Sequence, residues 1–297
     1  MTSQANNLKK YANWLKRQPL SDTTKRAYVS RIKRFQGFLD ASGEDILDLL
    51  KDKSNLEMVF VLKSYKIRLK KKHKLSPATV NAHLTAIDHY LQYLGIARIP
   101  EIPREDLPQE APRALSLKEQ KRFLRAVAGC RRSKDRAIAL LMFYTGIRIG
   151  ECADLDVDDL FVVGRKRKVI IRSGKGDRYR EIPLNEEVCD AARDWLRDRA
   201  IKYGDKEIEE AVFLNPQGGR ISTAGLDLIV RKIGEACGIV LSAHILRHTL
   251  LTNLVRNGND LVLVAEIGGH SKLETTRRYS LPTELDKEKA MSALLIE

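Results

Sequence analysis

The chain has 297 residues, with 43% hydrophobic residues, 31% charged residues and a net charge of +14, and this composition is typical of a globular protein with about two domains. No stretch approaches the roughly 20 consecutive apolar residues of a membrane span, and the first residues lack the apolar segment of a secretory signal, so we expect a cytoplasmic protein without a membrane anchor. The four cysteines are scattered without a CxxC pair, which indicates reduced core residues and neither a disulfide framework nor a metal site.

The positive charge is concentrated in the first third of the sequence. Residues 1–95 contain 18 Lys and Arg against 8 Asp and Glu, whereas the longer remainder contains 35 against 31. A basic segment of this kind favours nucleic acid or another polyanion as the partner, because it is attracted to phosphate groups over a long range. The alternative is a merely solubilising surface, but solubility does not require the charge to be gathered in one segment.

Residues 1–95 are predicted to form a compact bundle of four short amphipathic helices. Apolar residues recur at helical spacing in 8–15 and 28–39, a third helix is expected at 56–72, and a fourth begins at Ser76 and stops at Gly95. The outer faces of these helices are basic. Eight side chains there are expected to bind nucleic acid: Lys25, Arg26, Arg31, Lys33, Arg34, Lys70, Lys71 and Lys72.

A proline-rich linker is predicted at 96–115, because four of the nine prolines fall between residues 96 and 113 and interrupt any helix. The second domain, 116–297, begins at Ser116, which forms a capping-box pattern with Glu119. Three short β-prone runs, 159–163, 168–173 and 178–184, predict a small three-stranded antiparallel sheet. Helices are predicted at 134–145, 186–203, 222–237, 244–257, 260–267 and 283–296. We therefore expect a mainly α-helical fold with a small antiparallel β-sheet.

Three residues of the second domain have reactive side chains at positions where the local sequence pattern does not call for them. Arg148, in TGIRIGEC, begins a helix whose N-terminal N–H groups favour a phosphate, although Arg148 can instead pair with Glu151. Lys175 lies between two glycines at a β-turn, where most lysines are simply solvated. Tyr279 ends the segment GGHSKLETTRRY, at a position where a tyrosine is ordinarily a packing residue.

The segment SAHILRHTLL places charged and apolar residues on one predicted helix. His244, Arg247 and His248 lie on one face at helical spacing. An arginine on a half-buried face is unfavourable unless an anion pairs with it, so the stripe predicts a bound anion. A zinc site with His270 as third ligand is the alternative, but the metalloprotease pattern requires Glu where the chain has Ile245, and Arg247 would repel a cation.

Together these segments resemble the tyrosine recombinases, the phage-integrase and Xer family. The matching segments, in the family's order, are TGIRIGEC, GKGDRYREIPL, HILRHT and GGHSKLETTRRY. The resemblance covers nearly the whole chain, and its departures are minor, such as Ile267-Gly268 where a leucine-glycine pair is commoner. It implies a SAM-like four-helix core-binding domain followed by a catalytic domain that ends in an exchanged C-terminal helix.

The resemblance implies an enzyme that cleaves and rejoins DNA through a 3′-phosphotyrosyl link, without a metal, ATP or any other cofactor. The paired N–H donors of two arginines suit the non-bridging oxygens of a phosphodiester and can replace a metal there. Tyr279 is implied to be the nucleophile, and His244 to accept its proton. The implied catalytic residues are Arg148, Lys175, His244, Arg247, His270 and Tyr279.

The remaining roles are implied in the same way. Lys175 protonates the leaving 5′ oxygen, and His270 donates to the phosphate. Glu151 orients neighbouring groups, whereas His248 is assigned to packing. The implied partner is double-stranded DNA with inverted-repeat recombination sites, bound by a homotetramer that exchanges C-terminal helices.

Several functions fit these residues. The task is integration or excision, or the resolution of replicon dimers or transposon cointegrates, with or without accessory proteins or a second recombinase. A type IB topoisomerase shares the chemistry but needs no synapsis. A non-catalytic DNA-binding regulator shares the fold, but it predicts gaps among the six catalytic residues, and the sequence has none.

Overall fold

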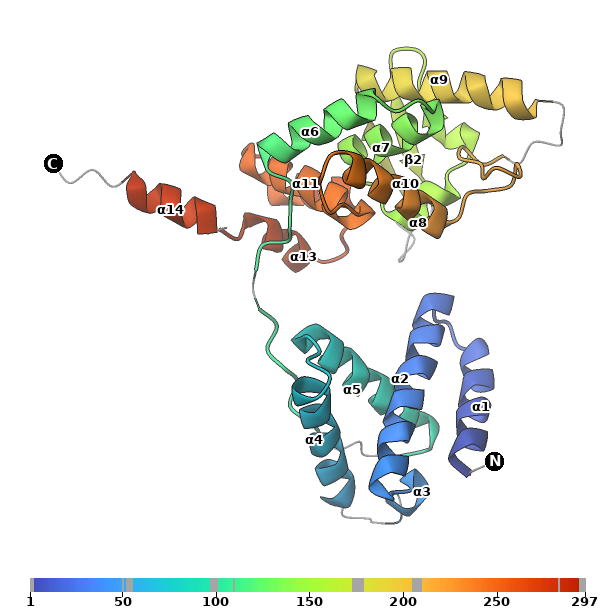
Figure 1. Ribbon diagram of the computed structural model, residues 1–297, viewed down its shortest axis with the longest axis vertical. Coiled ribbons are helices and arrows are strands. Elements are labelled where there is room, and N and C mark those ends of the chain that lie inside the picture. Colours follow the sequence, from blue (N-terminus) through green and yellow to red (C-terminus); the bar gives the residue numbers. More distant parts are fainter. Residues whose placement is uncertain are drawn as a thin grey trace. The chain divides into compact units, whose positions relative to one another are not determined.

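The computed structural model describes residues 3–49, 51, 56–96, 101–108, 110–172, 179–204, 210–282 and 284–293. The chain forms two compact units, Met1–Pro108 and Gln109–Glu297 (Figure 1). Each unit has its own hydrophobic core. None of the described helices is long and apolar enough to cross a membrane.

The first unit is a helical bundle. Its elements are α1 (Ser3–Lys16), α2 (Asp22–Ser42), α3 (Ile46–Leu49), α4 (Leu56–Lys71) and α5 (Pro77–Tyr93). The four longer helices agree with the sequence, whereas α3 is too short to show a helical period. Ser21 and Ser76 cap α2 and α5, because each hydroxyl accepts the backbone N–H three residues later. The side chains of Tyr11, Phe35 and Tyr65 are buried in the core.

Part of the predicted linker packs against the first unit. The carboxylate of Glu105 pairs with Lys66 and Lys70, at 2.8 and 2.6 Å. The backbone N–H of Glu105 donates to the side-chain oxygen of Asn81 at 2.7 Å, and Ile102 packs on the first core. The segment 101–105 is therefore held by side chains of the bundle, although its prolines suggested a semi-extended spacer.

The second unit is mostly helical, with one small sheet (Figure 1). Strands β1 (Leu160–Phe161), β2 (Lys168–Ile171) and β3 (Arg180–Pro183) pair antiparallel in chain order. This confirms the predicted fold class and the three-stranded sheet. The other elements are α6 (Leu117–Ala128), α7 (Ser133–Thr145), α8 (Ile149–Asp154), η1 (Val157–Asp159), α9 (Glu186–Tyr203), α10 (Thr223–Ala236), α11 (Ala243–Arg256), α12 (Leu261–Gly268), α13 (Leu273–Arg277), η2 (Arg278–Ser280) and α14 (Glu284–Ser292).

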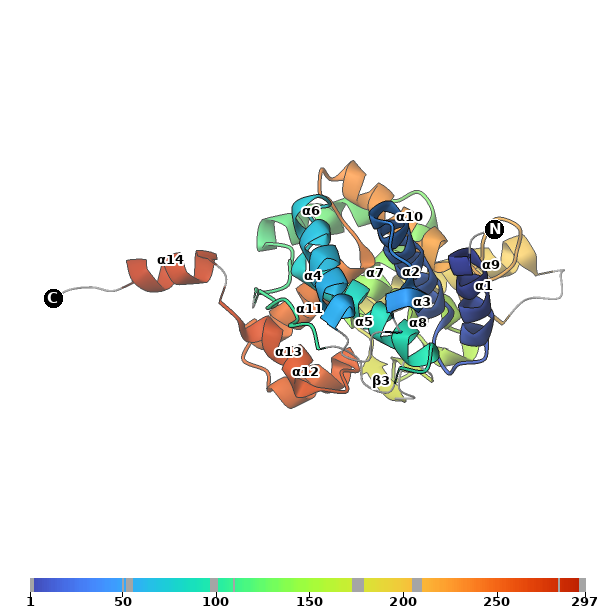
Figure 2. The same cartoon turned by 90° about the horizontal axis from the view of Figure 1, so that it is seen from below.

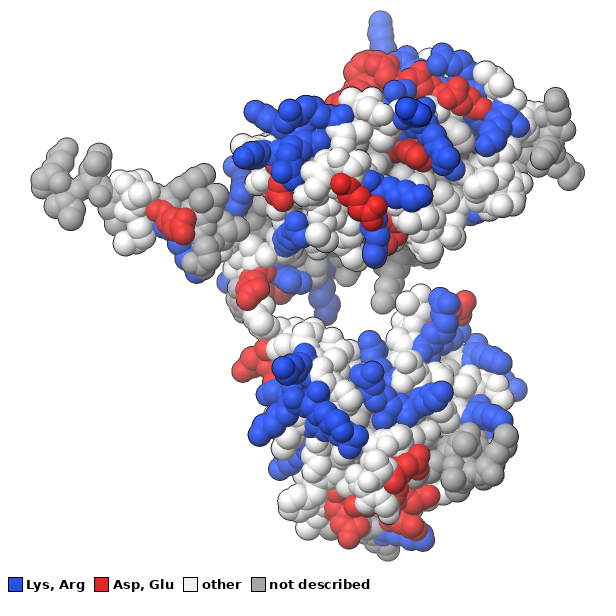
Figure 3. Space-filling view, viewed as in Figure 1, with Lys and Arg blue, Asp and Glu red and all other residues white. Residues whose placement is uncertain are grey.

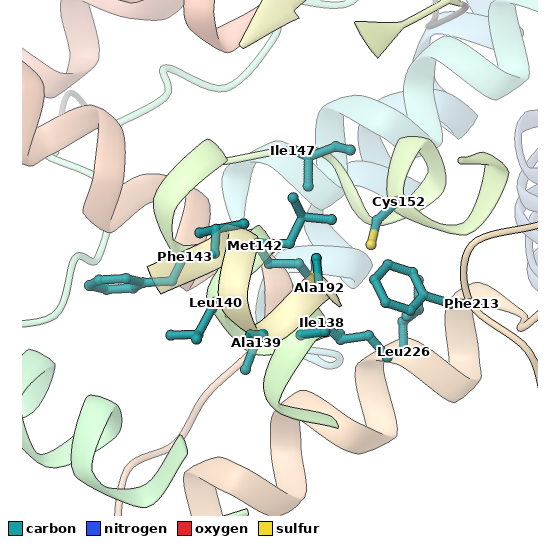
Figure 4. Close-up of a cluster of buried hydrophobic side chains, with 14 of the residues drawn as sticks. Ile138, Ala139, Leu140, Met142, Phe143, Ile147, Cys152, Ala192, Phe213 and Leu226 are labelled. Carbon is teal, nitrogen blue, oxygen red and sulfur yellow. The ribbon is translucent and has the colours of Figure 1, made fainter. Parts of the chain in front are cut away.

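Helix α7 forms the centre of the second core. Its residues 137–143 are all buried, as expected for a segment that is apolar nearly all round. Figure 4 shows Ile138 and Met142 of α7 among Cys152, Phe213 and Leu226, which come from three other parts of the unit. Because α8 and α11 both contact helices of this core, the first turns of both are held by a rigid framework.

The last helix lies apart from this core. In both views α14 projects from the body of the second unit (Figures 1 and 2). Its attachment includes an ion pair of 2.8 Å between Asp286 and Arg256, the last residue of α11. The helix is thus anchored near its start, while its far end extends away from the unit.

We predict that Thr249→Val destabilises the second unit. The Thr249 hydroxyl on α11 is buried, donates to the Ile245 carbonyl at 2.7 Å and accepts the backbone N–H of Leu115 at 2.9 Å. Valine has nearly the same shape but leaves this buried N–H without its acceptor, which costs about 1–3 kcal/mol. Urea unfolding measures the loss. Thr249→Ser keeps the hydroxyl and is the control, and a valine variant as stable as the wild type contradicts the prediction.

Candidate active site

Three arginine side chains converge on the C-terminal end of α12. The carbonyls of residues 267–269 each accept a hydrogen bond from a different arginine. In that order the donors are Arg180 Nε at 3.1 Å, Arg247 Nη2, and Arg148 Nη2 at 2.7 Å. Carbonyls at the end of a helix have no partner within it and carry the negative end of its dipole. The end of α12 therefore holds three cations close together.

The glycine pair at this helix end makes the approach possible. Gly269 has a φ of 59°, a left-handed conformation that glycine adopts without strain. A Cβ atom on Gly269 would lie 2.8 Å from Arg180 Nη1 and 3.2 Å from Arg148 Nη1. A side chain here would therefore push two guanidinium groups away from the carbonyls that hold them.

Glu151 on α8 joins two of these arginines. Its carboxylate accepts from Arg148 Nη1 at 2.7 Å and from Arg180 Nη1 and Nη2 at 3.1 and 2.7 Å. It also accepts the backbone N–H of Arg148 at 2.9 Å. Burial by itself raises the pKa of Glu151, but the bonds from Arg180 and Arg148 outweigh it and lower the pKa to about 2. The carboxylate is ionised at neutral pH and bonded on both oxygens.

Arg247 and His270 form a second buried pair. Arg247, only 4% exposed, donates through Nη1 to the carbonyl of Gly146 at 2.6 Å. Its Nη2 lies 2.9 Å from His270 Nε2, and His270 Nδ1 lies 2.8 Å from the hydroxyl of Thr276. Because an arginine only donates, Nε2 of His270 accepts and Nδ1 carries the proton.

The surroundings of His270 determine whether its ring is charged. Burial, and then the charge of Arg247, lowers the pKa of His270 to about 4, so the ring is neutral at pH 7. Burial also lowers the pKa of Arg247, to about 10. The sequence leads us to expect that His270 donates to a phosphate. In the free chain its Nε2 accepts instead, so donation there requires a proton on Nε2.

Tyr279 lies beside this cluster, on the turn η2. It is 5% exposed and packs with Leu251 and Val264. Its hydroxyl lies 2.9 Å from Nδ1 of His248, and its ring is parallel to that of His270 at 6.0 Å between centroids. Burial raises the pKa of Tyr279, against the opposing charge of Arg247. The phenol is therefore protonated at neutral pH, and its oxygen lies within hydrogen-bond distance of the His248 ring.

The two other histidines of the stripe differ in their surroundings. His248 is half-buried, and burial followed by the nearby His244 lowers its pKa to about 4. His244 is exposed, with its ring nearly parallel to that of His248 at 5.9 Å between centroids. The sequence assigns His248 to packing, whereas the structure places it against the Tyr279 hydroxyl. His248 is therefore a site residue that reasoning from the sequence misses.

Arg180 and Thr276 are two further site residues that the sequence does not single out. For Arg180 a signal exists, because alternation along β3 places it on the same side as the buried Ile182. An arginine on the buried side of a strand requires a partner, here Glu151. Thr276 offers no such signal, since its contact with His270 depends on how α13 packs against α12.

The predicted lysine, Lys175, lies outside the described residues. The five other residues implied to be catalytic belong to this one region of the second unit. A cavity of about 670 Å³ between β3 and helices α12 and α13 borders Arg180, Gly269 and His270. Within the described part of the chain, no group of three or more His, Cys, Asp or Glu side chains is placed to hold a metal ion.

The basic side chains assigned to nucleic acid lie on α2 and around the end of α4. Figure 3 shows Lys and Arg gathered on the visible face of the first unit. Lys25 also donates to the carbonyl of Lys16 at 3.2 Å, and Lys70 pairs with Glu105, so these two help to hold the unit itself. The exposed members of the set are Arg26, Lys33, Arg34, Lys70, Lys71 and Lys72.

Residues 113–284, more than half of the chain, match the phage integrase family. The TnP I resolvase of Bacillus thuringiensis is 27% identical over 294 residues, which cover 96% of this chain and 99% of that protein. The tyrosine recombinase XerA of Thermococcus kodakarensis is 28% identical over 229 residues, 76% of this chain and 79% of that protein.

Solved structures share the fold. The XerH site-specific recombinase bound to its difH substrate matches with a TM-score of 0.71 at 22% identity, over 99% of this chain and 91% of that one. The Tn1549 transposon integrase in complex with transposon right end DNA matches with a TM-score of 0.64 at 21% identity, over 96% and 98%. The chain therefore belongs to the phage integrase family, and it is a tyrosine-type site-specific recombinase.

Proposed function

We propose that the cluster at the end of α12 binds the scissile phosphate of DNA and that Tyr279 attacks it. The observation that supports this most directly is the position of the Tyr279 hydroxyl beside a buried, positively charged group of side chains. Three guanidinium groups and one carboxylate leave that group with two positive charges. A phosphodiester carries one negative charge, and its five-coordinate transition state carries two, so the match improves as the reaction proceeds.

Arg148 and Arg247 are the proposed phosphate ligands. A guanidinium has five N–H donors, and the bonds of Arg148 to Glu151 and Gly269 use one on each Nη. The Arg148 side chain is 35% exposed, so it can reach a phosphate without leaving these partners. Attack of the Tyr279 oxygen forms a 3′-phosphotyrosyl bond and breaks the bond from phosphorus to the 5′ oxygen. We propose that Lys175 protonates this leaving oxygen, so that it departs as a 5′ hydroxyl. The bond energy is kept in the new ester, and a second strand can reseal it.

The proton of Tyr279 leaves toward the histidine stripe of α11. In the free chain His248 holds the hydroxyl at 2.9 Å, and its lowered pKa keeps it neutral and able to accept a hydrogen bond. His244, one helical turn away, is exposed. We propose that His248 holds the hydroxyl at rest and that His244 accepts the proton once a phosphate is bound. His244 thus keeps the role that the resemblance implies, and the added step is the contact of the hydroxyl with His248 before a phosphate binds.

Double-stranded DNA carrying inverted-repeat sites is the proposed partner. The exposed basic side chains of the first unit support a proposal that residues 1–95 bind the duplex, while 116–297 catalyse. Two proteins that share the fold were solved in complexes: XerH with its difH substrate, and the Tn1549 integrase with transposon right end DNA. The similarity to a resolvase over nearly the full length favours the resolution of replicon dimers or transposon cointegrates among the recombinase tasks, with integration as the second candidate.

We predict that Tyr279→Phe binds DNA with unchanged affinity but forms no covalent adduct on a nicked suicide substrate. Phenylalanine keeps the packing with Leu251 and Val264 and removes only the nucleophilic oxygen. Denaturing gels measure the adduct, and band shifts measure binding. Tyr144→Phe is the matched control and should form the adduct normally, with or without EDTA. An adduct that persists in Tyr279→Phe moves the nucleophile to another tyrosine.

We predict that the free energy of unfolding falls less between pH 7 and pH 5 in His248→Gln than in the wild type. Burial lowers the pKa of His248 from its ordinary 6.5 to about 4, so the unfolded chain binds this proton more readily than the folded one. This contribution to the free energy of unfolding is complete above pH 6.5 and is lost as the pH falls toward 4. Urea unfolding at pH 7 and pH 5 should show a smaller difference in His248→Gln than in the wild type. Equal differences would mean that His248 has the same pKa in the folded and the unfolded chain, and they would contradict the prediction.

We propose that the enzyme acts as a tetramer in which α14 of each copy docks on the next. Met291 near the end of α14 is 68% exposed. An exposed apolar helix end gains stability when another surface covers it, and head-to-tail docking around a ring is a heterologous interface that closes. The sequence places three further apolar residues at helical spacing with Met291, and their side chains lie outside the described ones: Ala290, Leu294 and Leu295.

We predict that deletion of 287–297 leaves a folded protein that binds single sites but fails to recombine paired ones. The deletion keeps the ion pair of Asp286 with Arg256 and removes only the part of α14 that docks on a neighbour. An assay on a plasmid with two sites measures recombination, and band shifts measure binding. Glu288→Ala, which changes an exposed charge on the same helix, is the control. Recombination at the full rate by the truncated protein overturns the docking proposal.

A further inference from the structure

Arg180 is a buried cation outside the set of six residues that the resemblance implies. It is 7% exposed and begins β3. All three nitrogens of its guanidinium are bonded: Nε to the carbonyl of Ile267 at 3.1 Å, and both Nη atoms to Glu151. Such a two-point bond between planar groups fixes the orientation of both partners, which an ammonium group cannot do. Arg180 therefore sets the plane of the Glu151 carboxylate.

The orientation of Glu151 in turn determines the position of Arg148. The carboxylate binds Arg148 through both its backbone N–H and its Nη1, so it fixes the start of α8 and the guanidinium together. If Glu151 had Arg148 as its only partner, the two charges would cancel. Because Arg180 supplies a second positive charge to the same carboxylate, the group of three keeps one net positive charge beside the phosphate position.

Arg180 is also held from the side of α12. The Ile267 carbonyl, which accepts from Arg180, is two residues before the Gly269 carbonyl, which accepts from Arg148. The two guanidinium groups are thus bonded to the same helix end and to the same carboxylate. Arg148 is held by the Glu151 carboxylate and by the end of α12, and Arg180 is bonded to both. A movement of Arg180 would therefore change both groups that hold Arg148.

We propose that Arg180 is a positioning residue for the phosphate ligand Arg148, because it shares the charge of Glu151 and fixes that carboxylate. Arg180 does not itself touch the phosphate. The inference rests on the proposed function, in which Arg148 binds the scissile phosphate. It predicts that the loss of Arg180 affects cleavage through Glu151, and that removing the charge of Glu151 partly compensates.

The test compares cleavage of a nicked suicide substrate by four variants with the wild type. Arg180→Met should slow cleavage about 100-fold while the affinity for the uncleaved site stays within about twofold. Arg180→Met with Glu151→Gln should cleave at least tenfold faster than Arg180→Met alone, because Arg148 no longer faces an unshared carboxylate. Arg180→Lys should recover only part of the rate, since an ammonium cannot bond both carboxylate oxygens in one plane. Thermal melting verifies that each variant is folded.

Two outcomes overturn the inference. Cleavage at the wild-type rate by folded Arg180→Met shows that Arg148 needs no such support. A double variant no faster than Arg180→Met shows that Arg180 does not act through the charge of Glu151. Arg148→Ala, the fourth variant, separates these results from a failure of the proposed function. If it cleaves at the wild-type rate, Arg148 is not the phosphate ligand, and the proposed function fails together with the inference that rests on it.

Discussion

Three guanidinium groups share one helix end, and the architecture of the second unit follows from keeping them there. Like charges in a partly buried site repel one another strongly, because the local dielectric screens them poorly. Here the repulsion is offset by the carbonyls of 267–269 at the negative end of α12 and by the carboxylate of Glu151. The three arginines come from the start of α8, from β3 and from α11, so these elements and α12 are fixed relative to one another.

Burial, together with the same concentration of charge, sets the protonation state of the neighbouring side chains. Burial and the adjacent cations lower the pKa of His270 and of His248, so both are neutral and able to accept hydrogen bonds at pH 7. Burial raises the pKa of Tyr279, although the arginines oppose this, and the phenol keeps its proton. The free protein therefore holds Tyr279, the proposed nucleophile, in its protonated form beside the proposed phosphate-binding groups.

Much of the fold is predictable because the signals are local. The capping box of Ser116 and Glu119 is present in the structure, and so is the three-stranded sheet that the three short β-prone runs predict. What the sequence does not reveal depends on contacts between distant segments. The docking of 101–105 requires Glu105 to meet Lys66 and Lys70, which no local pattern indicates. The short α3 has too few residues to show a period.

The residues of the candidate site also fall into those with a local sequence signal and those that depend on contacts between distant segments. Arg148 at a helix start and the stripe of α11 are visible as local anomalies, and both lie in the cluster. Arg180 and His248 escape notice because their importance comes from Glu151 and Tyr279, which are 29 and 31 residues away in sequence. The acceptors at 267–269 are harder still to foresee, because main-chain oxygens are the same in every residue. Only the conformation of the helix end distinguishes them.

The use of main-chain oxygens has a practical result for mutagenesis of such proteins. Alanine scanning replaces side chains, so it reveals the arginine donors of this cluster but not the carbonyls that gather them. A scan of 267–269 alters the acceptors only indirectly, chiefly at Gly269, where any side chain conflicts with the left-handed backbone and with two guanidinium groups. Replacing an amide by an ester in the backbone weakens a carbonyl acceptor directly. For this arginine cluster, chemical protein synthesis therefore gives access to the carbonyl acceptors that genetic substitution leaves untouched.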